Sequence, residues 1–324
     1  NPIVRYFLFG LFCPLSRLMA LGEAVLERER PGVIAYTDTY NMGVRCLLSL
    51  AKHKGIPLLR IQYGWTFPKD YVDGGEGHFA VTGNYFKELL IKELPHAQER
   101  IVVTGQPRYD RIVSDDVSPA ELKKRFGIDL GKKVVLFAST HFYDFDLTES
   151  VDPAGLQQHY EWLRSIYTEL DKIDDVYILV KPHPKPSDRI DLHEQMISSM
   201  RAPGKFRLFP AASDIIDLIR ICDVLVTFGS TTLMEAMALQ KPIVTANLYT
   251  ESVEALPYVQ QGVVMAAAKK EDIFPAVTAI LNDRGLQEKM RENQKKFIGH
   301  WLYKIDGKAS TRVVELMERI CARA

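Results

Sequence analysis

The chain has 324 residues, which is the length of two ordinary domains. Hydrophobic residues make up 47% and charged residues 25%, as in globular proteins, and 41 basic residues balance 41 acidic ones. This balance excludes a general nucleic-acid binder, which carries a strong basic excess, but it allows a local basic pocket for one phosphorylated ligand. The four cysteines are scattered without metal-site or disulfide spacing, which indicates a reducing cytoplasm.

The first apolar stretch covers residues 3–26 and contains Arg5, Pro14, Arg17 and Glu23. These interruptions argue against a membrane-spanning helix, and the stretch lacks the cleavage pattern of a signal peptide. We expect an amphipathic helix that packs on a sheet. The alternative is a helix lying on a membrane surface, which would hold the protein at the inner face of the cell membrane.

After this stretch, short β-type runs alternate with amphipathic helical segments. The predicted strands are residues 33–36, 57–61, 79–82 and 101–104, with helices over 42–53 and 85–94. Strands that alternate with helices predict βαβ units and a parallel sheet.

A polar stretch rich in Gly, Pro and Asp, residues 113–133, predicts a domain boundary. A second series follows, with strands at 134–138, 176–180, 206–209, 224–227, 242–246 and 263–266 and helices at 156–171, 191–200, 215–221 and 232–239. We therefore predict an α/β fold of two Rossmann-like, doubly wound domains, residues 1–128 and 129–324. The ligand cleft is expected between them, at the carboxyl ends of the strands.

The first predicted domain is short. Its four strands are few for a doubly wound domain, and the chain begins with Asn1 rather than Met. We expect this domain to be incomplete, with its initial strands upstream.

A glycine and three hydroxyl residues, Gly229, Ser230, Thr231 and Thr232, stand between an apolar strand and the helix that carries Glu235. Backbone N–H groups, hydroxyl donors and the helix dipole make such a junction suited to an anion. The alternative is plain N-capping by Ser230 or Thr231. Capping needs only one hydroxyl, so the cluster favours phosphate binding, and Glu235 is predicted to belong to the same nucleotide-binding set. The glycine pattern is neither a Walker nor a Rossmann one, so neither an ATPase nor a nicotinamide enzyme is indicated.

The motif Lys181-Pro182-His183-Pro184 directly follows the apolar strand 176–180. Two prolines stiffen the turn, and a cation and an imidazole leave the strand at its carboxyl end. Such a pair is suited to holding a diphosphate or to protonating a leaving phosphate. A lone His in a turn is more often structural, but its place at the same sheet edge as the Gly-Ser-Thr-Thr turn favours a catalytic role for Lys181 and His183.

Further candidates follow other strands. Glu251 comes after the strand 242–246, where it can bind ribose hydroxyls or cap the next helix. Thr140 and His141 follow the strand 134–138 and face the cleft in the predicted topology. The first domain contributes the run Gln62-Tyr63-Gly64 to its own, acceptor-side edge.

Five short motifs occur in a definite order along the chain. They are Val81-Thr82-Gly83, Ile101-Val102-Val103-Thr104-Gly105-Gln106-Pro107-Arg108, Lys181-Pro182-His183-Pro184, Gly229-Ser230-Thr231-Thr232-Leu233-Met234-Glu235-Ala236 and Lys241-Pro242. This order resembles the GT-B superfamily, and within it the branch of CDP-glycerol glycerophosphotransferases, capsule polysaccharide transferases and UDP-N-acetylglucosamine 2-epimerases. The resemblance covers about residues 31–267.

The resemblance implies a transferase without a cofactor or metal, whose substrate is a nucleotide-activated donor. In capsule-type transferases the His of a His-Pro motif contacts the donor phosphate, so His183 would stabilise the departing nucleotide. Ser230, Thr231 and Thr232 would hold phosphate, and Glu251 the ribose. Cationic side chains and the helix dipole would supply the charge that a metal supplies elsewhere.

Two departures separate the members of this branch. The epimerases carry His-Arg-x-x-Asn and a Ser-Gly-Gly turn, where this chain reads Ser139-Thr140-His141-Phe142-Tyr143 and Gly229-Ser230-Thr231-Thr232. Glycerophosphotransferases carry a His-Gly pair, with the His as base, where this chain has Tyr63-Gly64. A phenol stays protonated at neutral pH and is a poor base.

We therefore expect a glycosyltransferase that moves a sugar from a nucleotide-activated donor to a glycan or lipid-linked acceptor, in capsule polysaccharide or other cell-envelope synthesis. The alternatives are a UDP-N-acetylglucosamine 2-epimerase-like enzyme, a CDP-glycerol glycerophosphotransferase and a non-catalytic nucleotide-sugar-binding module.

Overall fold

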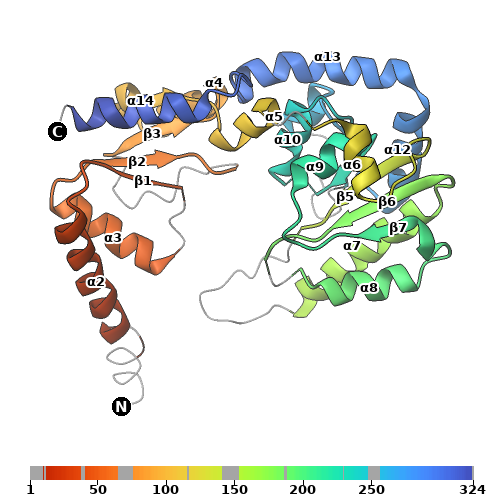
Figure 1. Ribbon diagram of the computed structural model, residues 1–324, viewed down its shortest axis with the longest axis horizontal. Coiled ribbons are helices and arrows are strands. Elements are labelled where there is room, and N and C mark those ends of the chain that lie inside the picture. Colours follow the sequence, from red (N-terminus) through yellow and green to blue (C-terminus); the bar gives the residue numbers. More distant parts are fainter. Residues whose placement is uncertain are drawn as a thin grey trace. The chain divides into compact units, whose positions relative to one another are not determined.

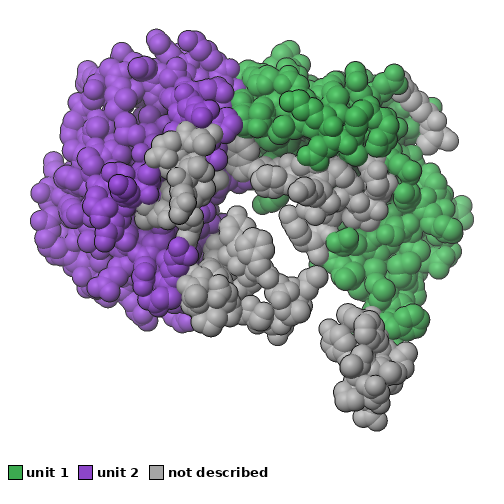
Figure 2. Space-filling model, turned by 180° about the vertical axis from the view of Figure 1, so that it is seen from behind, with its two compact units in different colours: residues 1–114, 299–324 green, residues 115–298 purple. Residues whose placement is uncertain are grey.

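The computed structural model describes residues 10, 12–37, 41–64, 76–114, 117–140, 153–185, 188–228, 230–246 and 256–322. The chain divides into two compact units (Figure 2). Unit 1 combines Asn1–Ser114 with Gly299–Ala324, and unit 2 is Asp115–Ile298. The predicted domains are residues 1–128 and 129–324. In the division into compact units, residues 115–128 fall in unit 2 and residues 299–324 in unit 1.

Unit 1 contains a four-stranded sheet of order β1-β2-β3-β4, in which every pair is parallel (Figure 1). Its elements are α2 (Cys13–Glu29), β1 (Ile34–Tyr36), α3 (Met42–His53), β2 (Leu58–Ile61), β3 (His78–Val81), α4 (Asn84–Glu93), β4 (Ile101–Val103), α5 (Asp110–Ser114) and α14 (Ala309–Cys321). Short 3-10 helices, η2 (Pro95–Arg100) and η3 (Pro107–Tyr109), flank β4.

Both faces of this sheet are covered, because successive side chains of a strand point to opposite sides. Leu58 packs with the α3 residue Leu48 and with Leu26 of α2. Its neighbour Leu59 packs on the other side with Val313, Leu316 and Ile320, the apolar stripe of α14. This stripe explains why the C-terminal helix belongs to unit 1 rather than to the domain that precedes it in the chain.

The predicted helix of residues 3–26 is seen as α2, which starts at Cys13 within the described residues. It packs on α3 and reaches the strands through Leu26. Within the described ranges, no helix combines the length and the apolar composition that crossing a membrane requires.

Unit 2 contains a six-stranded parallel sheet of order β10-β9-β8-β5-β6-β7. Its elements are α6 (Pro119–Arg125), β5 (Lys133–Ala138), α7 (Pro153–Asp171), β6 (Val176–Lys181), α8 (Ile190–Ser198), η4 (Pro203–Lys205), β7 (Phe206–Leu208), α9 (Ile215–Ile221), β8 (Val224–Thr227), α10 (Thr232–Ala238), β9 (Ile243–Thr245), α11 (Pro257–Gln260), β10 (Met265–Ala266), η6 (Lys270–Asp272), α12 (Ile273–Asn282) and α13 (Arg284–Trp301), whose last turn enters unit 1. The prediction of two α/β domains with parallel sheets is confirmed.

The strands of unit 2 are apolar on both faces, as expected for a parallel sheet between two helical layers. Val135 and Phe137 of β5 pack with residues of α7 and α12, such as Leu163 and Val277. Leu136 points to the opposite face and is fully buried there. On that side α6, α9 and α10 lie together (Figure 1).

Candidate active site

The sheet of unit 2 reverses its strand order between β5 and β8. β5 comes first in the chain, β6 and β7 follow on one side of it, and β8, β9 and β10 on the other. In open α/β sheets, ligands bind at the carboxyl ends of the strands, next to such a reversal. The observed order therefore places the best candidate site of this unit at the ends of β5, β6 and β8.

The strand register aligns the ends of β5, β6 and β8, after which three of the predicted site segments begin. Ala138 at the end of β5 pairs with Lys181 of β6 and with Thr227 of β8. The backbone N–H of Ser139 donates to the Lys181 carbonyl at 3.0 Å. Consequently the segments that follow β5, β6 and β8 begin side by side, as the sequence predicted.

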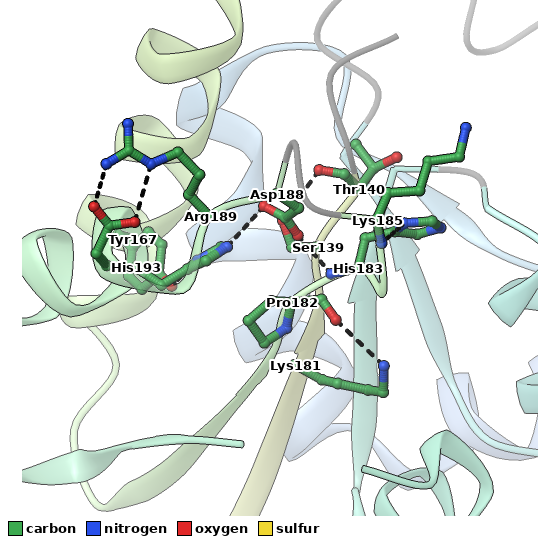
Figure 3. A network of polar contacts seen from close by, with 11 residues as sticks. Ser139, Thr140, Tyr167, Lys181, Pro182, His183, Lys185, Asp188, Arg189 and His193 are labelled. Atoms are coloured by element: carbon green, nitrogen blue, oxygen red, sulfur yellow. Dashed lines mark hydrogen bonds and ion pairs between the residues drawn. The ribbon is translucent and has the colours of Figure 1, made fainter. Parts of the chain in front are cut away.

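His183 is held from two directions (Figure 3). Its backbone N–H donates to Asp188 Oδ2 at 2.5 Å, and its ring atom Nδ1 accepts the backbone N–H of Lys185 at 3.1 Å. Because Nδ1 accepts a hydrogen bond, the neutral ring carries its proton on Nε2. Burial lowers the pKa of His183; the Asp188 charge acts against this, whereas Lys185 and Lys181 add to it. In its neutral form the group is therefore an oriented imidazole with an Nε2–H donor.

Lys181 is buried, with 7% of its surface exposed. Its Nζ donates to the carbonyl oxygen of Pro182 at 3.2 Å (Figure 3). It also donates to the carbonyl oxygen of Ala211 at 3.0 Å. Burial lowers its pKa, and the charge of Glu235 is the largest opposing influence. These contacts tie the turn after β6 to the backbone at residue 211, which is a structural use of the ammonium. A catalytic role for Lys181 stays a prediction.

The hydroxyl of Ser230 lies within hydrogen-bonding distance, 3.2 Å, of Thr227 Oγ1 and accepts the N–H of Thr232 at 3.3 Å. It therefore satisfies one of the first amides of α10, which is the capping role considered above as the alternative. Thr231 precedes α10 and makes no side-chain cap hydrogen bond. Glu235 is buried in α10, and its charge acts to raise the pKa of Lys181. Its predicted place among the nucleotide- and phosphate-binding residues stays a prediction.

The remaining predicted residues of unit 2 divide into two groups. Thr140 lies at the end of β5 and is buried, and its carbonyl accepts Ser139 Oγ at 3.4 Å. His141, Gly229 and Glu251 lie outside the described residues. The Lys241-Pro242 motif has a structural explanation, because Lys241 Nζ donates to the carbonyls of Arg220 and Cys222 at the end of α9.

In unit 1 the turn after β2 presents Tyr63, with 63% of its surface exposed. The side chain of Gln62 accepts the Thr82 N–H at 2.8 Å and donates to the Gly64 carbonyl at 2.9 Å. Gln106 donates to the Gln62 carbonyl at 2.6 Å, and Gly64 has a φ of 65°, which favours glycine. Gln62 and Gly64 therefore shape the turn, and Tyr63 is the side chain that it presents to solvent.

Sequence reasoning missed a set of buried polar residues behind His183, namely Asp188, His193 and Tyr167. His193 Nε2 lies 2.8 Å from Asp188 Oδ1, and His193 Nδ1 lies 2.7 Å from Tyr167 Oη. One signal was available: His193 lies on α8 between the apolar residues Leu192 and Met196, which pack against the core. A polar residue at such a position indicates a buried partner.

Within the described part of the chain, no three His, Cys, Asp or Glu side chains are grouped in a way that could hold a metal ion. The expected independence from metals stays a prediction.

Solved structures of other proteins share this fold. The S. aureus MnaA–UDP co-structure matches with a TM-score of 0.69 and 18% identity, over 96% of this chain and 81% of that one. UDP-GlcNAc 2-epimerase from Neisseria meningitidis, bound to UDP-GlcNAc, matches with a TM-score of 0.68 and 18% identity, over 94% and 81%. A variant of the wall teichoic acid polymerase TagF matches with a TM-score of 0.61 and 16% identity, over 90% and 73%.

Sequence comparison adds a relative and a family. The processive diacylglycerol beta-glucosyltransferase of Bacillus pumilus (strain SAFR-032) is 24% identical over 246 residues, which are 75% of this chain but only 59% of that relative. A model of the CDP-glycerol:poly(glycerophosphate) glycerophosphotransferase family matches residues 69–319, which are most of this chain. The expected superfamily is thereby confirmed, and the chain belongs to the CDP-glycerol:poly(glycerophosphate) glycerophosphotransferase family.

Proposed function

We propose that this protein is a GT-B-type glycosyltransferase that moves a sugar from a nucleotide-activated donor to a surface polysaccharide or glycolipid acceptor. One observation carries the proposal: His183, whose Nδ1 accepts the Lys185 N–H, lies at the sheet edge next to the reversal of strand order. The Bacillus pumilus relative, a glucosyltransferase, supports sugar transfer. The UDP of the S. aureus co-structure and the UDP-GlcNAc of the Neisseria structure support a nucleotide-activated donor.

The proposed chemistry places His183 on the leaving group. As the bond between the sugar carbon and the phosphate oxygen breaks, negative charge grows on the nucleotide phosphate, and the Nε2–H of His183 donates to it. The acceptor hydroxyl forms the new bond to the sugar carbon and releases its proton to the surrounding water, while the nucleotide leaves with the electron pair of the broken bond. Donors aimed at a growing charge in a partly buried site are worth about 10²- to 10³-fold in rate. Ser230, Thr231 and Thr232 are proposed to hold the same phosphates.

The acceptor side is assigned to unit 1, where Tyr63 stands exposed at the end of β2. We also propose peripheral contact with the inner face of the cell membrane through residues 3–26. Phe12, Leu15 and Leu21 in and beside α2 are exposed apolar side chains of the kind that enter a lipid surface.

A thermal-shift series with UDP, CDP, CMP and GDP tests the donor site. Ligand bound at 100 times its Kd stabilises the folded chain by about 2.7 kcal/mol, so the cognate nucleotide raises the melting temperature most. His183→Ala should lower the rate of transfer from that donor by about 10²- to 10³-fold while the melting temperature of the free protein stays unchanged. His96→Ala, at an exposed histidine of unit 1, is the control. Undiminished transfer or donor hydrolysis by His183→Ala would refute the proposal.

The second candidate is transfer of glycerol phosphate from CDP-glycerol, which the family match favours. The match begins at residue 69, so it does not include the Gln62-Tyr63-Gly64 turn where the family's His-Gly pair is expected. Transfer from CDP-glycerol by the wild type, or its appearance in Tyr63→His, would favour this candidate. Conversion of UDP-N-acetylglucosamine without any acceptor would instead identify an epimerase.

A further inference from the structure

A chain of buried hydrogen bonds runs from α7 to the backbone of His183 (Figure 3). Tyr167 Oη lies 2.7 Å from His193 Nδ1, and His193 Nε2 lies 2.8 Å from Asp188 Oδ1. The second carboxylate oxygen, Oδ2, accepts the backbone N–H of His183 at 2.5 Å. The Asp188 and His193 side chains have no exposed surface, and Tyr167 is fully buried.

The last link fixes one hydrogen-bond direction in this chain, and an ionised Asp188 with a neutral His193 fixes the others. The N–H of His183 can only donate, so Asp188 Oδ2 is an acceptor. With Asp188 ionised, Oδ1 also accepts, and His193 donates through Nε2–H. Its Nδ1 then carries a lone pair and accepts the Tyr167 hydroxyl. Burial raises the pKa of Tyr167 well above 10, so this hydroxyl keeps its proton.

A carboxylate with no exposed surface is costly to bury, and this cost argues against an incidental core residue. The charge of Asp188 acts on three other titratable groups. It raises the pKa values of Lys181, His183 and His159, against the effect of burial. Removing either hydrogen-bonding partner would leave a buried charge or donor unsatisfied. The four residues therefore form one hydrogen-bonded network, in which a substitution at Tyr167 or His193 alters the hydrogen bonds of Asp188.

We propose that Asp188, His193 and Tyr167 are positioning residues for His183. This rests on the proposed function in one respect, namely that His183 binds the donor phosphate. Asp188 fixes the backbone of His183, and the Lys185 amide fixes its ring, so the Nε2–H donor is oriented before any ligand arrives. A donor oriented in advance loses no free energy to reorganisation when the phosphate binds or gains charge.

The chain offers a matched control in the last residue of α7, one turn after Tyr167. Asp171 is also buried, at 6% exposure, and its carboxylate also accepts backbone N–H groups, from Arg201 at 2.6 Å and Ala202 at 3.2 Å. It lies before β6, at the amino edge of the sheet, whereas Asp188 follows β6 at the carboxyl edge. Asp171→Asn therefore makes the same carboxylate-to-amide change away from His183, and it also removes the ion pair between Asp171 and Lys205 at 3.3 Å.

The first arm of the experiment measures amide hydrogen exchange in the free protein and needs no substrate. In Asp188→Asn, exchange at the His183 amide should accelerate by about tenfold or more, because its acceptor loses its charge. Tyr167→Phe, which keeps the ring and the fold, should give a smaller acceleration at the same amide. Asp171→Asn should change exchange at residues 201 and 202 only. Unchanged exchange at His183 in the folded Asp188→Asn and Tyr167→Phe variants would overturn the proposal.

The second arm measures affinity for UDP and CDP by calorimetry, alone and in a His183→Ala background. Asp188→Asn should weaken the affinity for the more tightly bound of the two nucleotides by about tenfold in the wild-type background. In the His183→Ala background the loss of affinity should be less than about twofold, because the effects of residues in contact are coupled. An equal loss in both backgrounds, or an equal loss in Asp171→Asn, would show general destabilisation and overturn the positioning role. If the wild type binds neither nucleotide, the proposed donor class fails, while the exchange arm still decides the positioning.

Discussion

Gly83, in the turn between β3 and α4, is the position where adding one carbon has the most predictable consequence. A Cβ at Gly83 would lie 2.2 Å from the carbonyl oxygen of Trp301, 2.3 Å from its carbonyl carbon and 2.6 Å from the His300 oxygen. Gly83 has a φ of −152°, which any residue adopts, so the obstacle is space and not backbone conformation. The motif Val81-Thr82-Gly83 therefore ends in glycine because the last turn of α13 approaches it closely.

The magnitude follows from what would have to move. An ordinary contact needs about 3.4 Å, so the carbonyl or the added carbon must shift by about 1.2 Å. Trp301 resists this shift because it is 3% exposed and its ring stacks on Tyr85 and meets the edge of Phe86. Overpacking usually costs about 1–3 kcal/mol, and a backbone obstacle places Gly83→Ala at the upper end. At roughly 3 °C per kcal/mol, the melting temperature of unit 1 falls by roughly 9 °C.

Scanning calorimetry and hydrogen exchange of β3 and α4 measure this loss. Gly299→Ala is the matched control, because an added Cβ there meets no atom within 4 Å and Gly299 lies inside α13. It should stabilise the protein by about 0.5–1 kcal/mol. The reasoning is refuted if the melting temperature of Gly83→Ala lies within about 1 °C of the wild type. It is also refuted if Gly299→Ala lowers the melting temperature as much as Gly83→Ala does.

Three further predictions concern single contacts. Asp110→Ala should destabilise unit 1 by about 0.5–2 kcal/mol in urea titrations, because Asp110 accepts the first N–H groups of α14 from Ala309, at 2.9 Å, and Ser310, at 2.8 Å; an unchanged midpoint would contradict this. Gly105→Ala should cost about 1–2 kcal/mol in the same assay, because a φ of 77° is left-handed. Burial lowers the pKa of His159 below 6.5, so its contribution to stability is present above pH 6.5 and is lost as the pH falls through its folded-state pKa. Unfolding free energies of His159→Phe should therefore fall less steeply below pH 6.5 than those of the wild type, and equal slopes would contradict this.

Local signals predicted the elements of the fold well. The helices 42–53 and 215–221 begin where predicted because Asn41 and Asp214 accept the first amides of α3 and α9. The strand expected at 263–266 is shorter, and β10 is only Met265–Ala266. Val263 and Val264 donate instead to the Tyr258 carbonyl in the turn after α11, so an apolar run alone did not distinguish strand from buried turn.

Long-range partners could not be predicted in the same way. The apolar stripe of α14 shows that this helix packs on something, but only the structure shows that Leu59 and Ala80 of the first sheet are its partners. Likewise, Lys181-Pro182-His183-Pro184 marks the site in the sequence, whereas Tyr167 meets His193 only because α7 packs beside α8. No spacing rule links residues on two separate helices.

The return of the C-terminal segment to unit 1 has a consequence for biosynthesis. As the ribosome releases the chain from its N-terminus, unit 2 is complete when Ile298 has emerged, but one face of the first sheet still lacks α14. Leu59 and Ala80 stay uncovered until Val313, Leu316 and Ile320 follow. Unit 2 can therefore complete its fold before the first sheet is covered. A premature stop after Ile298 would release one folded unit joined to a sheet with one exposed face.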